Sequence, residues 1–182
     1  MDLSLITPMI LTGNCEANLA ACLGDLGFAR RIVIIDSGST DRTLEIAQAH
    51  ANVEVIYRPF DHHAAQRSFG IAQVNDGWIL CLDSDYRIDA CLLAEISALP
   101  EEGCDGYLVP YAYCIFGRPL RASLMPPRAI LARSGCLRVD SDGHAERFRV
   151  DGAVGKLHAR IRHDDRKPLE RWLQRQVFYA RM

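Results

Sequence analysis

Hydrophobic runs and polar breaks alternate along the first hundred residues of this chain. Short apolar runs rich in β-branched residues predict strands that are buried on both faces, as in a parallel sheet. Segments with apolar residues three or four positions apart predict helices. Strands alternating with helices predict an α/β domain with a mostly parallel central sheet and flanking helices. The predicted strands cover 3–11, 31–35, 53–57 and 78–82, and the predicted helices cover 14–26, 40–50, 62–74 and 89–99.

The pattern changes after about residue 100. From 106 to 149, short apolar pieces are interrupted by Gly, Pro and Arg, which predicts strands and loops with partly antiparallel pairing. A last helix is predicted from Pro168, and it is still running where the chain stops at Met182. We therefore expect one domain over 1–182 that is cut short at its C-terminus.

Charge and cysteine content narrow the class of protein. The formal net charge is -2, so no overall positive field attracts nucleic acid, and we expect no nucleic-acid partner. The seven cysteines are odd in number and include no C-x-x-C pair, which argues against a disulfide framework or a zinc ribbon. The sequence shows neither a signal-peptide pattern nor an apolar stretch long enough to span a bilayer. We expect a cytoplasmic protein, and peripheral work at the inner face of the membrane is compatible with this.

Two polar turns follow predicted strands, at 36–41 and at 83–85. In parallel sheets, ligands bind beyond the carboxyl ends of the strands, where both turns would lie. Asp83 and Asp85 offer the oxygen ligands that Mg²⁺ and Mn²⁺ prefer. Gly38 lets the backbone pass close to a ligand. A solvated acidic turn at 83–85 and a plain helix-capping turn at 36–41 are the simpler alternatives.

These turns and several further segments resemble glycosyltransferase family 2, in particular a bacterial subgroup similar to lipopolysaccharide-core-type enzymes. Asn14–Leu19 is similar to the family's N-E-E-x-N-[IL] segment, although Cys15 replaces its first Glu. Val33–Asp41 is close to V-V-D-S-G-S-T-D, and Trp78–Tyr86 looks like W-V-L-x-L-D-A-D, with Tyr86 where many members carry an acidic residue. The similarity covers nearly the whole chain and includes Gln66–Gly70, Gly117–Arg121, Pro126–Arg128, Asp142–His144 and His163–Leu169.

The resemblance implies a GT-A fold, that of the nucleotide-diphospho-sugar transferases, and a hexosyltransferase activity. The reaction would be an inverting transfer from a nucleotide-diphospho-sugar, preferably UDP-linked, to a cell-envelope glycan or glycolipid. The expected cofactor is Mg²⁺ or Mn²⁺. Residues 1–100 would form the nucleotide-binding half and 101–182 the acceptor-side half.

The resemblance also implies roles for individual residues. Asp83, Asp85 and His163 would hold the metal, and Asp36 would contact the nucleotide base. An inverting reaction needs a general base near the acceptor hydroxyl. The matching zone is 142–146, where Ala145 interrupts the family pattern of His followed by Glu; this leaves Asp142 and Glu146 as candidates, and Asp142 is favoured. The residues expected to bind the donor are Thr12, Asn14, Glu16, Asp36, Ser37, Gly38, Gln66, Arg67, Asp83 and Ser84.

Two other functions stay open at this point. The chain could be a sugar-nucleotide-binding module without catalysis, such as a truncated remnant. It could also be a sugar-phosphate nucleotidyltransferase, but 12–15 lacks the basic residue that such a phosphate loop needs. Three arginines among prolines form either a phosphate site or a solvated face. They are Arg118, Arg121 and Arg128.

Overall fold

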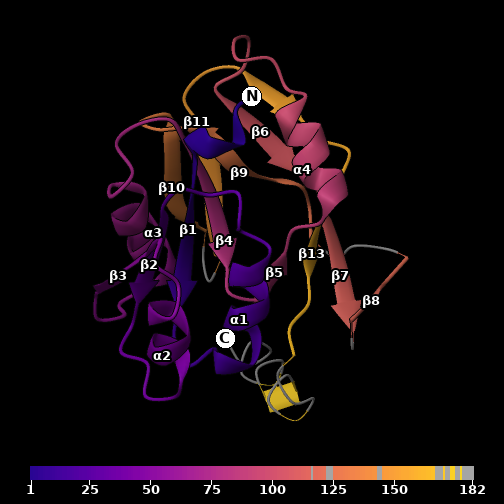
Figure 1. Cartoon of the computed structure of the whole chain (residues 1–182). Coiled ribbons are helices and arrows are strands. Elements are labelled where there is room, and N and C mark those ends of the chain that lie inside the picture. Colours follow the sequence, from indigo (N-terminus) through magenta and orange to yellow (C-terminus); the bar gives the residue numbers. More distant parts are fainter. Residues whose placement is uncertain are drawn as a thin grey trace.

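A seven-stranded sheet forms the centre of the computed structural model, which describes residues 1–115, 117–121, 125–142, 145–166, 170, 173–174 and 177 (Figure 1). The strand order is β12-β6-β9-β4-β1-β2-β3. The bounds are β1 (Ile6–Thr12), β2 (Ile32–Asp36), β3 (Val53–Tyr57), β4 (Trp78–Asp83), β6 (Gly106–Val109), β9 (Arg128–Arg133) and β12 (Val154–Lys156).

The pairing within this sheet is mostly parallel, as the sequence predicts. β1 pairs in parallel with β2 and β4, and β2 pairs in parallel with β3. β9 alone among the seven runs antiparallel to its neighbours β4 and β6, within the described residues. All five residues of β2 are buried, which explains why it reads as an uninterrupted β-branched run rather than an alternating one.

The helices cover the sheet and agree with the predicted segments to within a few residues. Helix α4 begins where Asp89 accepts a hydrogen bond from the backbone N–H of Leu92, as a helix-capping carboxylate does. One prediction is wrong: Leu3–Leu5 is not part of the first strand but a 3₁₀ turn, because the Asp2 carboxylate caps it. The bounds are α1 (Glu16–Gly24), α2 (Thr43–Gln48), α3 (His63–Ile71) and α4 (Ala90–Ser97).

The second half adds short strands, several of them antiparallel, as predicted. β10 (Leu137–Asp142) and β11 (Ala145–Val150) form an antiparallel hairpin that packs against α3. A smaller sheet has the order β5-β13-β7-β8. Its strands are β5 (Tyr86–Arg87), β7 (Tyr111–Ile115), β8 (Arg118–Pro119) and β13 (Ile161–His163).

The last predicted helix, from Pro168 onward, lies largely outside the described residues. The described part of the chain contains no helix long and apolar enough to cross a membrane. All seven cysteines are free thiols, and Cys15, Cys22, Cys81 and Cys114 are buried.

Candidate active site

A cavity of about 680 Å³ opens at the carboxyl ends of β1, β2 and β4. These strands run in the same direction, so their ends lie together at the lower edge of the sheet in Figure 1. One side of α3 forms part of the wall, and β11 and β13 supply residues from the second half. The predicted residues that line the cavity are Thr12, Asn14, Ser37, Gly38, Gln66, Arg67, Asp83, Ser84, Asp85, Glu146 and His163.

Asp36 does not line the cavity. Its side chain is 1% exposed, and its carboxylate accepts hydrogen bonds from Thr12 Oγ1 at 2.8 Å and from Ser39 Oγ at 2.6 Å. The backbone N–H groups of Gly38 and Ser39 donate to its other oxygen at 2.9 and 2.8 Å. Burial would raise the pKa of Asp36, but these hydrogen bonds together lower it. Asp36 therefore organises the 36–41 turn, and its contact with a nucleotide base stays a prediction.

Asn14 and Glu16 join the loop after β1 to the loop after β2. Asn14 has a φ of 50°, and its side-chain oxygen accepts from the backbone N–H of Thr40 at 2.8 Å. The Glu16 carboxylate accepts from the backbone N–H of Arg42 at 3.0 Å. Glu16 does not line the cavity, whereas Asn14 does. The two residues therefore fix the shape of the cavity floor, and direct donor contact by Glu16 stays a prediction.

Gln66 lies on the cavity wall but is fully engaged by the protein. Its side-chain amide donates to Ser37 Oγ at 3.3 Å and to the Arg58 carbonyl at 2.9 Å, and its oxygen accepts from the Arg58 guanidinium. Gly38 has a φ of 94°, a conformation that favours glycine. These contacts hold the 36–41 turn against α3, so that Ser37 and Gly38 face the cavity.

The acidic turn after β4 presents Asp85 beside His163. Asp85 Oδ2 lies 3.2 Å from His163 Nε2, and the backbone N–H of Asp164 donates to the Asp85 carbonyl at 2.9 Å. Burial would lower the pKa of His163, but the hydrogen bond with Asp85 and its negative charge raise it. Asp85 and His163 are 78 positions apart in the sequence, and the pairing of β13 with β5 brings them together.

The groups around Asp85 offer oxygen and nitrogen atoms of the kind that a divalent cation binds. Asp85 Oδ1 and His163 Nδ1 are buried polar atoms without a hydrogen-bond partner, which is costly unless a ligand completes them. The Asp83 side chain is 41% exposed and faces the same cavity. No preformed cluster of three or more His, Cys, Asp or Glu side chains exists within the described residues. A cation would therefore take Asp85 first and leave positions open for oxygen atoms of a ligand.

Arg67 connects the acidic turn with the second half. The side chain is 3% exposed, and its guanidinium pairs with Asp83 at 2.5 Å and with Glu146 at 3.3 Å. It also donates to the Leu82 carbonyl at 2.7 Å. Burial would lower the pKa of Arg67, but the two carboxylates raise it above its usual value. In turn, Asp83 is partly exposed to the cavity but desolvated where it meets the core, which would raise its pKa, and the Arg67 charge holds that pKa low.

Of the two candidates for the general base, only Glu146 has a side chain in the described part of the structure. Glu146, on β11, lines the cavity with a side chain that is 8% exposed and paired with Arg67. The backbone of Asp142 ends β10 opposite Ala145, but its side chain lies outside the described part, as do Gly143 and His144. The choice between Asp142 and Glu146 therefore stays a prediction.

Several cavity residues were missed or only partly foreseen from the sequence. Arg128 lines the cavity, whereas Arg118 and Arg121 are exposed elsewhere. Arg128 begins β9, whose antiparallel direction brings this residue to the same edge as the carboxyl ends of the parallel strands. Cys15 could have been found from its place in the segment after the first strand. The others are Leu11, Gly13, Phe60 and His63.

Comparison with known proteins relates this chain to a family. Residues 9–140 match the family described as glycosyl transferase family 2. The chain is 31% identical over 121 residues to the lipopolysaccharide core biosynthesis glycosyltransferase LpsC of Rhizobium meliloti. That match covers 59% of this chain and 45% of the relative. The chain spans about half the length of the curated relatives it matches.

Solved structures share the fold. Glucosyl-3-phosphoglycerate synthase from Mycobacterium tuberculosis, in complex with Mn²⁺, UDP and phosphoglyceric acid, superposes with a TM-score of 0.59 at 18% identity. The superposition covers 95% of this chain and 75% of that chain. S. aureus TarS in complex with UDP-GlcNAc gives a TM-score of 0.55 at 24% identity, covering 65% and 37%. The predicted GT-A fold is thereby confirmed.

Proposed function

We propose that this chain, which belongs to glycosyl transferase family 2, transfers a hexose from a nucleotide-diphospho-sugar to a glycan or glycolipid of the cell envelope. The observation that carries the proposal is the pair of unpartnered atoms, Asp85 Oδ1 and His163 Nδ1, beside a cavity at the carboxyl edge of the sheet. The name of the similar R. meliloti protein supports a lipopolysaccharide-type acceptor. The work would take place in the cytoplasm or at the inner face of the membrane.

The donor would lie across the ends of β1, β2 and β4. The turns after β1 and β2 would receive the nucleotide, since Asn14, Ser37 and Gly38 line that part of the cavity. UDP is the first nucleotide to test, because both fold neighbours described above were solved with UDP or a UDP-sugar. In this arrangement 1–100 is the nucleotide-binding half and 101–182 faces the acceptor.

Asp85, with Asp83 and His163, would hold Mg²⁺ or Mn²⁺, which supplies Lewis-acid neutralisation of the departing diphosphate. Arg128 is a further cation on the cavity wall that can approach a phosphate. The acceptor hydroxyl is a poor nucleophile, so a carboxylate must take its proton as it attacks the anomeric carbon from the opposite side. Asp142 is the favoured base, because Glu146 already pairs with Arg67.

A thermal-shift screen of sugar nucleotides, with and without Mn²⁺, tests this function. We expect one class of sugar nucleotide to raise the melting temperature only when Mn²⁺ is present, and the same compound to be hydrolysed slowly to a sugar of inverted anomeric configuration. Binding without any turnover, with or without acceptor, would favour a non-catalytic module instead. No shift with any sugar nucleotide would contradict the proposal.

A further inference from the structure

One buried guanidinium touches both halves of the proposed active site. Arg67 lies on α3, and it reaches Asp83 at the end of β4 and Glu146 on β11. Its guanidinium also lies 5.8 Å from the centre of the Phe148 ring, on the same strand as Glu146. Glu146 is 79 residues away in sequence, so this contact adds a buried ion pair to the packing of α3 against the hairpin of the second half.

We infer that Arg67 is a positioning residue that holds the donor-side Asp83 and the acceptor-side Glu146 as one unit. The inference rests on the proposed function, which assigns the two carboxylates to opposite sides of the reaction. It differs from the sequence-based expectation that Arg67 binds the donor directly. A phosphate could reach this guanidinium only by breaking contacts that it already makes, because the side chain is 3% exposed.

The geometry of the guanidinium supports this positioning role. Nε and one terminal nitrogen face the two Glu146 oxygens at 3.3 Å, while the other terminal nitrogen donates to the Leu82 carbonyl at 2.7 Å. With the bond to Asp83, the planar guanidinium makes four hydrogen bonds at once, whereas an ammonium has only three donors. Removing either end of a buried ion pair leaves a charge without compensation. A substitution at Glu146 should therefore alter the contact between Arg67 and Asp83, and a substitution at Asp83 should alter the contact between Arg67 and Glu146.

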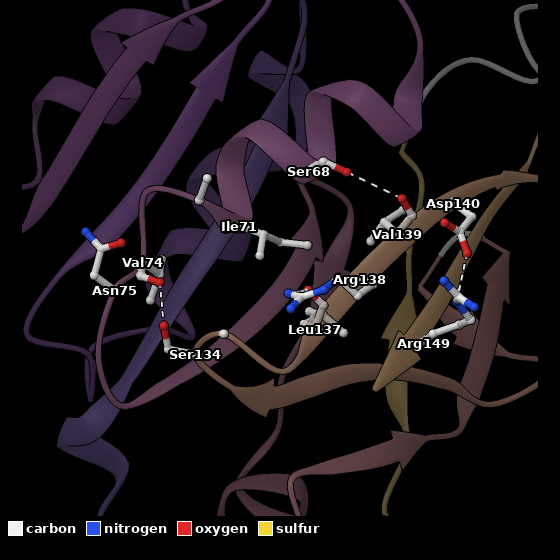
Figure 2. A pocket seen from close by; sticks show the side chains of 12 residues that line it. Ser68, Ile71, Val74, Asn75, Ser134, Leu137, Arg138, Val139, Asp140 and Arg149 are labelled. Atoms are coloured by element: carbon white, nitrogen blue, oxygen red, sulfur yellow. Dashed lines mark hydrogen bonds and ion pairs between the residues drawn. The ribbon is translucent and has the colours of Figure 1, made fainter. Parts of the chain in front are cut away.

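The chain provides a matched control on the same hairpin. Asp140 and Arg149 form an ion pair at 2.8 Å between β10 and β11, but their side chains are 49% and 61% exposed. Figure 2 shows this pair at a second cavity, of about 500 Å³, whose lining does not include Asp83. Ser68 of α3 also bonds to Val139 there, at 3.4 Å, so the hairpin has an attachment that does not involve Arg67 (Figure 2).

A double-mutant cycle tests the inference. The dissociation constant of UDP with Mn²⁺ is measured by calorimetry for the wild type, Arg67→Lys, Glu146→Gln and the double variant. We expect the fold-change of the double variant to differ from the product of the single fold-changes by at least about fivefold, the lower end of usual coupling between sites. A smaller difference would overturn the inference. Asp140→Asn combined with Arg67→Lys should give the product, because the two sites are independent.

Hydrolysis of a UDP-sugar provides a readout that a purely structural role would not move. Arg67→Lys and Glu146→Gln should each lower kcat, and the double variant should be no slower than the slower single variant. A rise in KM at unchanged kcat for Arg67→Lys would mean direct donor binding and would overturn the inference.

The same cycle in urea unfolding covers variants that bind too weakly to measure. Glu146→Gln should lower the free energy of unfolding more in the wild type than in the Arg67→Lys background. Equal losses in both backgrounds would show that Arg67 and Glu146 do not act as one unit. If the wild type itself binds no nucleotide with Mn²⁺, the proposed function fails, while the unfolding cycle still decides whether Arg67 and Glu146 are coupled.

Discussion

At the scale of single residues, charged groups of the site are committed to other parts of the protein before any ligand arrives. Asp36 is held by four hydrogen bonds from Thr12, Gly38 and Ser39, and Arg67 by Leu82, Asp83 and Glu146. Asp85 and His163 instead each keep one buried atom unpaired. This contrast separates residues that shape the site from two whose hydrogen-bonding capacity the described residues leave partly unused.

The first prediction concerns Asp36 and stability. Asp36→Ala leaves the donors of Thr12, Gly38 and Ser39 without their acceptor, so we expect a loss of roughly 1–3 kcal/mol in the free energy of unfolding, measured in urea. Asp76→Ala, at an exposed position, serves as the control and should change little. A loss for Asp36→Ala no larger than that of the control would show that the four hydrogen bonds do not stabilise the fold.

The second prediction concerns the pH dependence of that contribution. The pKa of Asp36 is lowered in the folded protein, so its ionised form stabilises the fold. This contribution is fully present above the unfolded-state pKa of about 3.9 and is lost as the pH falls through the folded-state value. The stability difference between wild type and Asp36→Ala should therefore shrink below about pH 4. A constant difference between pH 3 and pH 7 would contradict this.

The third prediction concerns the general base. Asp142→Asn keeps the size of the side chain and removes its basicity, so transfer to an acceptor should fall by about 10²–10⁴ while UDP affinity with Mn²⁺ stays unchanged. Glu146→Gln should slow transfer less, but should alter donor affinity through Arg67. If Glu146→Gln abolishes transfer and Asp142→Asn does not, the two roles are reversed.

At the scale of elements, the local pattern predicts the scaffold well but not the contacts across it. The β-branched run of β2 and the Asp89 cap of α4 are visible in the sequence because burial and capping act over a few residues. The attachment of Arg67 to Glu146 and of Asp85 to His163 depends on strand pairings separated by many residues. Hydrophobic periodicity contains no information on such pairings. The family resemblance suggested that Asp85 and His163 meet at a metal site, but it did not suggest that Arg67 contacts Glu146.

The fourth prediction tests the cap of α4, which packs near the start of β1. Asp89 accepts from the backbone N–H of Leu92 at 3.0 Å and also pairs with Arg162 at 3.1 Å. Asp89→Ala should lower the free energy of unfolding by about 0.5–2 kcal/mol, whereas Asp89→Asn should keep most of the stability, because Asn is also a good cap. Equal losses in urea unfolding would assign the effect to the partly exposed ion pair instead.

At the scale of the whole molecule, the sheet brings together residues from both halves of the chain at one edge. β1, β2 and β4 direct their loops to the cavity, and β11 and β13 close it with Glu146 and His163. The hydrophobic pattern of the sequence changes near residue 100, yet residues from both sides of that point line one cavity. We therefore propose, as the central claim, that this shared edge binds a nucleotide through a metal ion held at Asp85.

Calorimetric titration of UDP into the wild type and into Asp85→Ala, each with and without Mn²⁺, tests that claim most directly. Mn²⁺ should strengthen UDP binding to the wild type and have no effect on binding to Asp85→Ala, and Asp76→Ala should behave like the wild type. Asp85→Ala that binds UDP with the same Mn²⁺ dependence as the wild type would contradict the claim.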